Sequence, residues 1–389
     1  MQNFFGKVIN VMPKTIQELI PAYIRNVEPY IPGKPIEEVE REIGVVAVKL
    51  ASNENPLGPS PLAMAAIQRT LGDSHRYPDG GCYYLREKLA AMYGVRMDEV
   101  LIGLGSSELI DLSARMLLHP GDEGLTSEGT FPLYYISIQA SGAREVRAPL
   151  RNYGFNLDAL AAAITPKTRY IILSNPNNPT GTMFTAPEFD RFLAKVPPDV
   201  LVVVDEAYCD YVGRDDYSRS IELVRQGRLL LVLRTFSKIY GLAGIRVGYG
   251  IGPAALLAEM DKIRTPFNTA GVSQAAALAA LDDAEHVRRS LESNRSGMRQ
   301  LVEGLDRLGV KYVPSFANFL LVDFGRVARP FADEMLKLGV IVRPVDWMGF
   351  PNCLRVTVGT REENDRFLIA LARVLHLHAG IDQPVKVTP

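Results

Sequence analysis

The sequence predicts an α/β protein: a large three-layer domain built on a mainly parallel sheet of about seven strands, and a smaller α+β domain. Between about residues 60 and 270, short β-rich runs alternate with amphipathic helical patterns, the rhythm of βαβ units. Two of the runs, VLVVVD (200–205) and LLLVLRT (229–235), are almost continuously apolar, as expected for strands buried on both faces of a parallel sheet. Beyond residue 270 the pattern changes, which predicts the second domain.

Each strand and helix of the large domain follows from a local pattern. Seven runs between turn signals are rich in apolar and β-branched residues, and we predict that they form the large sheet: 100–103, 123–128, 143–150, 169–174, 200–205, 229–235 and 246–252. Amphipathic stretches at 107–118 and 186–196 predict helices between them. Thr185 and Pro187 mark the start of the second helix, because proline is tolerated in the first turn.

The C-terminal third predicts a different architecture. An alanine-rich helix (270–283) leads into a long, charged amphipathic helix (284–309). Three runs at 318–324, 340–345 and 353–359 then alternate like strands with one open face. We expect three segments in the chain: an N-terminal arm with part of the small domain (1–55), a large domain (56–272) and a small C-terminal domain (273–389).

Composition and charge exclude several classes of protein. The chain has 389 residues, of which 47% are hydrophobic and 22% charged, the profile of a soluble globular protein with a substantial core. Its 43 basic and 44 acidic residues give a net charge of −1, and no basic run stands out, so we expect neither a nucleic-acid nor an anionic-membrane partner. No stretch approaches ~18 uninterrupted apolar residues, and the N-terminus lacks the features of a signal peptide.

Cysteine and histidine usage points to a reducing compartment and to no metal. Cys82, Cys209 and Cys353 are an odd, widely spaced set without a CxxC motif, which does not suit a disulfide framework. The five histidines show no HExxH motif and do not cluster with the cysteines. We therefore expect a cytoplasmic protein without a metal site.

Polar side chains follow several of the predicted strands, and ligands of open α/β sheets bind at the carboxyl ends of the strands. Asp205 ends a buried strand, with Tyr208 three residues on. A buried carboxylate is costly without a cation or a strong donor, so Asp205 is either a helix cap or the counter-charge of a protonated heterocycle that Tyr208 also contacts. The run RYIILSNPNNPTGT (169–182) ends in a loop fixed by proline and glycine, which either presents side-chain amides to a ligand or is only a rigid turn.

The run LIGLGSSELIDL (101–112) combines a strand, a glycine-rich turn and a helix start. Hydroxyl and free N–H groups of Ser106 and Ser107 at a helix N-terminus could hold a phosphate, or the serines could simply cap the helix. The third glycine of a dinucleotide-binding fingerprint is absent, because Glu108 occupies its place. This run favours a cup for a single phosphate over a dinucleotide site.

The run RTFSKIYGLAGIRVGYG (234–250) supplies the groups for covalent chemistry. Thr235 and Ser237 offer hydroxyls, Lys238 an amine and Arg246 a guanidinium. A lysine buried near another cation shifts toward its neutral, nucleophilic form, which suits Schiff-base chemistry, whereas an exposed Lys-Arg pair would not need an apolar, glycine-rich frame. An imine-forming lysine, a carboxylate, a phenol, an amide and a cup for one phosphate match pyridoxal phosphate.

The motifs also resemble those of a known family. Seven segments resemble the histidinol-phosphate aminotransferases, fold-type I, aspartate-aminotransferase-like enzymes that depend on pyridoxal 5'-phosphate: 50–61, 75–80, 174–182, 203–211, 234–250, 266–268 and 353–364. The resemblance covers nearly the whole chain, from about Tyr30 to Asn364.

The resemblance implies a role for each residue that faces the cofactor ring. Lys238 would form the Schiff base and carry the proton that is moved during transamination. Asp205 would pair with the pyridine nitrogen, while Asn178 and Tyr208 would bind the 3-oxygen of the ring. Phe131, in EGTFPLY, resembles the aromatic residue that stacks on the ring.

The resemblance also implies a phosphate cup, a substrate-binding group and a homodimer. Tyr77 is similar to the tyrosine that reaches the cofactor phosphate from the neighbouring subunit. Arg355 resembles the arginine that binds the acidic end of the substrate, with Arg343 and Tyr30 as helpers, Tyr30 coming from the other subunit. The cup residues that the resemblance implies are Ser106, Ser107, Thr235, Ser237 and Arg246.

Two departures bear on the substrate. Residues 103–108 read GLGSSE where the family often has GNGSDE, and GTFPLYY replaces the more usual PTFxxY. The expected reaction transfers an amino group between L-glutamate and imidazole-acetol phosphate, giving 2-oxoglutarate and L-histidinol phosphate. The alternative is a phenylalanine or tyrosine aminotransferase of the same branch, which shares almost every motif. Threonine-phosphate decarboxylation on the same fold is a more distant alternative, and a cofactor-sensing regulator lacks the spare length for a DNA-binding module.

Overall fold

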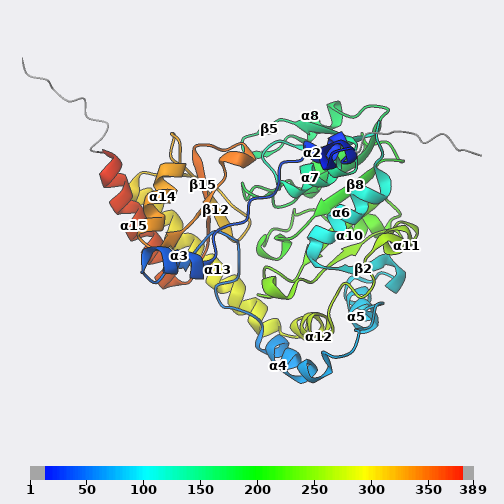
Figure 1. Ribbon diagram of the computed structural model, residues 1–389, viewed down its shortest axis with the longest axis horizontal. Coiled ribbons are helices and arrows are strands. Elements are labelled where there is room, and N and C mark those ends of the chain that lie inside the picture. The colour runs from blue at the N-terminus through cyan, green and yellow to red at the C-terminus, as the bar shows by residue number, and fades with distance from the viewer. Residues whose placement is uncertain (1–13, 380–389) are drawn as a thin grey trace, which may run out of the picture.

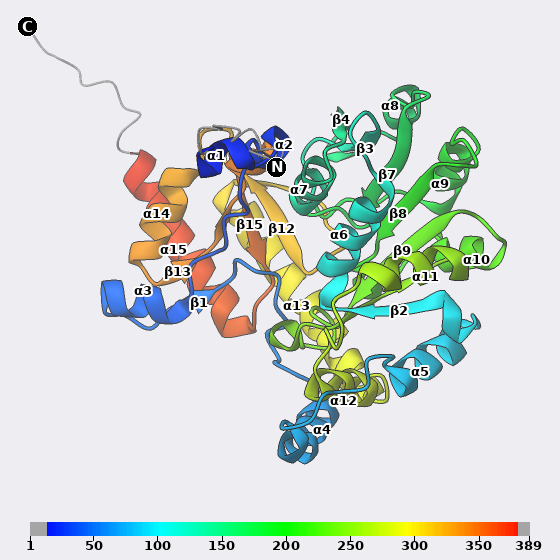
Figure 2. The ribbon, with the colours of Figure 1, turned by 45° about the vertical axis from the view of Figure 1, so that its right-hand side comes forward.

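A seven-stranded sheet lies at the centre of the larger lobe (Figures 1 and 2). The computed structural model describes residues 14–379, so the ends of the expected chain division, 1–13 and 380–389, lie outside the described residues. In spatial order the strands are β2 (Val100–Gly103), β10 (Gly248–Ile251), β9 (Leu230–Thr235), β8 (Leu201–Asp205), β7 (Thr168–Ser174), β3 (Glu123–Ser127) and β4 (Arg144–Ala148). β10 is antiparallel to β2 and β9, and the other pairings are parallel. All seven predicted strands are confirmed, with ends that differ by at most two residues.

Helices cover both faces of this sheet, which confirms the three-layer prediction. Successive residues of β8 alternate between the two cores: Val202 and Val204 belong to one apolar cluster, and Leu201 and Val203 to the other. The first cluster is covered by α4 (Pro61–Thr70), α5 (Tyr83–Tyr93), α8 (Leu157–Ala162), α9 (Ala186–Leu193), α10 (Ser220–Arg225) and α12 (Gly271–Ala280), and the second by α6 (Gly105–Leu117), α7 (Leu133–Ala140) and α11 (Ala254–Ile263). The predicted start of α9 is confirmed, since Thr185 and Glu188 form a capping box.

A four-stranded antiparallel sheet forms the smaller lobe. Its strands, in order, are β11 (Lys311–Val313), β12 (Phe319–Asp323), β15 (Cys353–Thr357) and β14 (Arg343–Pro344). The helices packed with it are α13 (Ala284–Leu308), α14 (Arg329–Lys337) and α15 (Arg361–Ala379). In Figure 1, α13 runs from beside α12 to the four-stranded sheet, so one long helix joins the two lobes. The boundary at residue 272 stays a prediction.

Two expected strands are divided in the structure. The run 340–345 forms β13 (Val340–Ile341), which pairs in parallel with β1 (Val48–Lys49), and then β14, which pairs with β15. The chain therefore leaves one sheet for another within six residues, which a single apolar pattern could not reveal. The run 143–150 ends at Ala148, because Pro149 has no N–H to donate to a ladder.

The N-terminal part of the chain packs along the outside of both lobes. Its helices are α1 (Ile16–Leu19), α2 (Ala22–Arg25) and α3 (Ile36–Ile43), and the remaining short strands β5 (Leu150–Arg151) and β6 (Gly154–Phe155) form a hairpin. α3 and β1 contact β13 and α14 through a small apolar cluster. Within residues 14–379, no helix has both the length and the apolar character needed to cross a membrane.

Gly241 should be essential for holding the loop after β9. Its φ is +68°, and a Cβ there would lie 2.0 Å from the backbone oxygen of Gly58, so Gly241→Ala forces two main chains apart. We expect a loss of at least about 3 kcal/mol in the free energy of unfolding, measured in urea. Gly227→Ala is the control, since its φ is +81° but its Cβ would meet nothing within 4 Å. It should cost only about 1 kcal/mol, and equal losses for the two variants would contradict the steric argument.

Candidate active site

The carboxyl ends of the central strands open into a cavity of about 270 Å³ between the two lobes. Every residue predicted for the site lines this cavity except Tyr77. Residues from the large sheet, the small sheet and the N-terminal segment all contribute: Tyr30, Ser106, Ser107, Phe131, Asn178, Asp205, Tyr208, Thr235, Ser237, Lys238, Arg246, Arg343 and Arg355. The cavity therefore forms only where the two lobes meet.

Lys238 lies in the cavity wall, three residues after the end of β9. Its Nζ donates a hydrogen bond to the backbone oxygen of Ser52 at 3.3 Å. Burial, and after it the guanidinium groups of Arg355 and Arg246, together lower the pKa of Lys238 to about 8, against the opposite effects of Glu54 and Asp205. Roughly a tenth of this amine is thus neutral at pH 7, far more than for a lysine with the ordinary pKa of 10.5.

Asp205 ends β8 in a buried position that lacks a directly paired cation among the described residues. The hydroxyl of Tyr134 donates to its Oδ2 at 2.9 Å, and the backbone N–H of Ala207 donates to its Oδ1 at 3.1 Å. Burial raises the pKa of Asp205 to about 6, while these two hydrogen bonds and the charge of Lys238 limit the rise. A carboxylate in this setting would be stabilised by a protonated ring nitrogen beside it.

Tyr208 and Asn178 face the cavity beside Arg355. The hydroxyl of Tyr208 accepts a hydrogen bond from Asn53 Nδ2 at 2.9 Å, and burial raises the pKa of Tyr208 to about 12. Arg355 donates from Nη1 to Asn178 Oδ1 at 2.6 Å and from Nη2 to the backbone oxygen of Ala51 at 2.5 Å. Its Nε is buried and has no hydrogen-bond partner among the residues described. A buried guanidinium with an unused donor and no paired carboxylate suits an anionic ligand.

The start of α6 forms a cup whose donors point at the cavity. No side chain caps this helix, so the N–H groups of its first turn, which holds Ser106 and Ser107, keep the positive end of the helix dipole uncovered. Arg246 extends its Nη1 to within 3.5 Å of Ser237 Oγ, and Ser237 Oγ accepts from Thr235 Oγ1 at 2.9 Å. These hydroxyls, N–H groups and guanidinium match the oxygens of a phosphate.

Two glycines make the approach of these segments possible. A Cβ at residue 248 would lie 2.6 Å from the backbone nitrogen of Ser106, and one at residue 105 would lie 2.8 Å from Arg246 Nη2. Any larger side chain would fill the cup or displace its guanidinium. Gly105, in the glycine-rich turn before α6, is therefore required both for the space that it leaves and for its φ of +74°.

Arg343 lies between two aromatic rings at the cavity. Its guanidinium carbon is 5.8 Å from the ring centroid of Tyr30 and 5.1 Å from that of Trp347, and its Nη2 donates to the backbone oxygen of Ile31. The expected contribution of Tyr30 from a neighbouring subunit stays a prediction, and in the described chain Tyr30 lies in the cavity. The hydrogen bond to Ile31 and the edge contacts of the Tyr30 ring with Phe131 and Trp347 hold it there.

Tyr77 does not reach the cavity of its own chain. Its side chain is 84% exposed, and its ring stacks on Phe267 at a centroid distance of 4.8 Å.

Three residues of the site were missed by the sequence analysis. Asn53 hydrogen-bonds Tyr208, and it belongs to the LASNENPLG run that the motif comparison had already noted. Tyr134 donates to Asp205 and is the first tyrosine of the GTFPLYY run, and nothing in that run indicates that its hydroxyl bonds to Asp205. Trp347, beside Arg343, belongs to no motif.

The donor set fits pyridoxal phosphate rather than a metal. A neutral lysine amine, a buried carboxylate, a phenol and a phosphate cup with space made by glycine surround one cavity. Among residues 14–379, no group of three or more histidine, cysteine, aspartate or glutamate side chains could hold a metal ion.

Comparison with known proteins agrees with this geometry. The profile of the family described as "Aminotransferase class I and II" matches residues 45–371. The histidinol-phosphate aminotransferase of Moorella thermoacetica is 49% identical over 354 residues, which cover 90% of this chain and 92% of the relative. That of Anaeromyxobacter sp. is 48% identical, covering 92% and 99%. The crystal structure of histidinol-phosphate aminotransferase from Sinorhizobium meliloti in complex with pyridoxal-5'-phosphate has a TM-score of 0.85 at 28% identity, covering 92% of this chain and 98% of that one.

Lys238 should react with amine-directed reagents at an unusually low pH. An amine attacks only when unprotonated, so a pKa of about 8 predicts that labelling rises with pH around that midpoint in the cofactor-free protein. The midpoint is measured by labelling with fluorodinitrobenzene over a range of pH, followed by mass spectrometry of the peptide that contains Lys238. Arg355→Met removes the largest electrostatic contribution and should raise the midpoint, whereas Arg307→Met, an exposed site, should not. A midpoint at the ordinary 10.5 would contradict the assignment.

Proposed function

The chain belongs to the family of class I and II aminotransferases, and we propose that it transfers an amino group between L-glutamate and imidazole-acetol phosphate, giving 2-oxoglutarate and L-histidinol phosphate. The family expected from the motifs is confirmed, and with it a pyridoxal-phosphate-dependent transaminase of the aspartate-aminotransferase-like fold. The observation that carries the substrate is the pair of guanidinium groups, Arg355 and Arg343, in one cavity with Lys238.

The residues around the ring divide the chemistry among them. Pyridoxal phosphate, when bound, supplies a carbonyl carbon that exchanges amines and a ring that withdraws electrons. Lys238 holds a neutral amine that can form the covalent link and later accept and return a proton. Asp205 keeps the ring nitrogen protonated, and Tyr134 holds this carboxylate in place through its hydroxyl. Tyr208 and Asn178 would bind the 3-oxygen, and Phe131 would hold the ring from one side of the cavity.

The phosphate is held by groups from the start of α6 and from the segment that follows β9. Ser106 and Ser107 donate from the first turn of α6, where the helix dipole favours an anion. Arg246 supplies the formal charge, and Thr235 and Ser237 donate from their hydroxyls, which otherwise bond to each other. This arrangement fixes the cofactor at its phosphate while Lys238 works at the other end.

The acidic end of the substrate binds to Arg355 and Arg343. A glutamate carboxylate has two oxygens and fits Arg355 alone, in a bidentate pair. A phosphate carries more charge and a third oxygen, which Arg343 can reach from between Tyr30 and Trp347. Two guanidinium groups thus let one pocket accept both anions of the two half-reactions.

The protein acts as a homodimer in the cytoplasm in this proposal. Tyr77 and Phe267 are exposed, and Tyr77 would contact the cofactor phosphate of the neighbouring subunit. A reducing compartment is supported by Cys82, Cys209 and Cys353, which are free thiols.

A paired-substrate assay tests the substrate. With L-glutamate as donor, kcat/KM for imidazole-acetol phosphate should exceed that for phenylpyruvate by at least about a hundredfold, because only the phosphorylated acceptor uses both guanidinium groups. Lys238→Ala should reduce turnover by about a thousandfold or more, since it removes the group that forms the imine and moves the proton. A preference for phenylpyruvate would identify an aromatic aminotransferase instead.

Mixed dimers test the assignment of Tyr77. Lys238→Ala and Tyr77→Ala subunits are co-expressed with different tags, and the mixed dimer is isolated by both tags. If Tyr77 acts on the neighbouring site, the mixed dimer contains one intact site, so activity at limiting cofactor should return to about half that of the wild-type dimer. If Tyr77 acted within its own chain, each site of the mixed dimer would carry a defect and activity would not return.

A further inference from the structure

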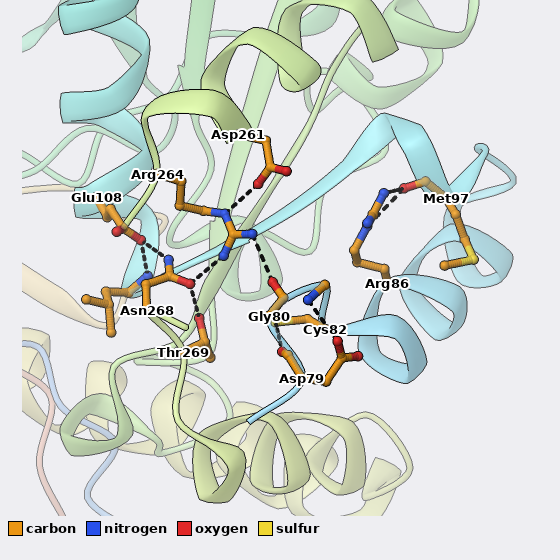
Figure 3. A network of polar contacts seen from close by, with 12 residues as sticks. Asp79, Gly80, Cys82, Arg86, Met97, Glu108, Asp261, Arg264, Asn268 and Thr269 are labelled. Carbon is orange, nitrogen blue, oxygen red and sulfur yellow. Dashed lines mark hydrogen bonds and ion pairs between the residues drawn. The ribbon is translucent and has the colours of Figure 1, made fainter. Parts of the chain in front are cut away.

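A relay of polar contacts joins Glu108 to the backbone of Gly80 through Asn268 and Arg264 (Figure 3). Asn268 Nδ2 donates to Glu108 Oε2 at 2.6 Å, and the same carboxylate oxygen accepts from the backbone N–H of Leu104 at 2.7 Å. On the other side, Asn268 Oδ1 accepts from Arg264 Nη1 at 2.5 Å. Neither Asn268 nor Glu108 lines the cavity, so neither contacts the cofactor.

Glu108 fixes the turn from which the cup is built. Its carboxylate reaches back to the N–H of Leu104, the N-cap residue just before α6, and so satisfies the donor that precedes the cup. Gly103 makes this possible, because a Cβ there would lie 2.9 Å from Glu108 Oε2. The next N–H groups, at Ser106 and Ser107, stay available for a phosphate. The position of the Glu108 carboxylate thus determines where these donors point.

The amide of Asn268 has one orientation that satisfies both of its neighbours. Its nitrogen faces the Glu108 carboxylate, and its oxygen faces the Arg264 guanidinium and, at 3.4 Å, the hydroxyl of Thr269. Reversal would set oxygen against carboxylate and nitrogen against guanidinium. An aspartate at position 268 would place its carboxylate against the carboxylate of Glu108, with no N–H to donate between them. Position 268 therefore requires an amide.

The other end of the relay reaches the loop that carries Tyr77. Arg264 donates from Nη2 to the backbone oxygen of Gly80 at 2.9 Å and from Nε to Asp261 Oδ1 at 2.7 Å. Figure 3 shows Arg264 between Asn268 and this loop. Phe267, adjacent to Asn268, stacks on Tyr77. The relay therefore joins two segments that are far apart in sequence.

We propose that Asn268 is a positioning residue for the cofactor phosphate: through Glu108 it holds the turn of the phosphate cup, and through Arg264 it ties that turn to the Tyr77 loop. The proposal rests on the proposed function, which assigns the phosphate to this cup. Asn268 acts through Glu108 and does not touch the cofactor. Its loss should weaken the hold on the phosphate and leave the groups around Lys238 unchanged.

The test compares two ligands that differ only in the phosphate. The cofactor-free protein is titrated with pyridoxal phosphate and with pyridoxal, and the dissociation constants are read from the absorbance of the Lys238 adduct. In Asn268→Asp, the dissociation constant of pyridoxal phosphate should rise by about tenfold, the effect of one lost charge-assisted hydrogen bond. The dissociation constant of pyridoxal should rise by less than about twofold. Asn156→Asp is the matched control: it adds the same charge at the start of α8, where an aspartate can still cap the helix.

A second variant exchanges the donor and the acceptor of the pair. In Glu108→Gln/Asn268→Asp, the pair again holds one carboxylate and one amide. The glutamine side chain must turn, because a single oxygen of Glu108 makes both contacts, so that its nitrogen donates to the new carboxylate while its oxygen accepts from Leu104. Affinity for pyridoxal phosphate should return to within about threefold of the wild type. If Asn268→Asp does not fold, as judged by circular dichroism, Asn268→Ala gives the same comparison, with a loss confined to the phosphorylated ligand.

Three results would overturn the proposal. They are an unchanged affinity in Asn268→Asp, an equal loss for both ligands, and no recovery in the exchanged pair. The failure of the proposed function looks different, because wild-type protein would then form the Lys238 adduct and yet transfer no amino group. That result would remove the proposed reaction and leave the role of Asn268 standing.

Discussion

The site depends on burying an amine among positive charges. Lys238 loses hydration in the cavity and lies near Arg355 and Arg246, so its proton is held weakly. Such a concentration of cations is costly unless anions arrive, and the cavity is shaped to receive two of them, a cofactor phosphate and the acidic end of a substrate. The ligands that the proposed chemistry requires are therefore the same ligands that offset this electrostatic cost.

The two-lobed architecture follows from this need, because no single sheet could supply all the charges. Lys238 and Asp205 come from the ends of large-sheet strands, whereas Arg355 lies on β15 of the small sheet. Arg355 bonds to Asn178 and to the backbone of residue 51, so one guanidinium connects the large sheet, the small sheet and the N-terminal segment. In the proposed reaction, a substrate anion bound to Arg355 would therefore act on the contact between the lobes as well as on the substrate.

The pattern of apolar residues was enough to predict the strands of the large sheet. These strands are buried on both faces, so their continuous apolar runs stand out from the amphipathic helices between them. The carboxyl ends of those strands then predicted which side chains would meet. The same reasoning could not find Tyr134 or Asn53, whose importance lies in hydrogen bonds to Asp205 and Tyr208, partners distant in sequence. It also missed the division of 340–345, which depends on the pairing of β13 with β1, segments hundreds of residues apart.

Trp347 gives the protein a built-in optical probe. It is the only tryptophan in the chain, and its ring lies 5.1 Å from the guanidinium carbon of Arg343. Indole emission responds to nearby charge, so the intrinsic fluorescence of the unmodified enzyme reports on one defined point, the arginine beside the substrate anion. Occupancy of that subsite can be followed in stopped-flow experiments without a label, separately from the visible absorbance that follows the cofactor.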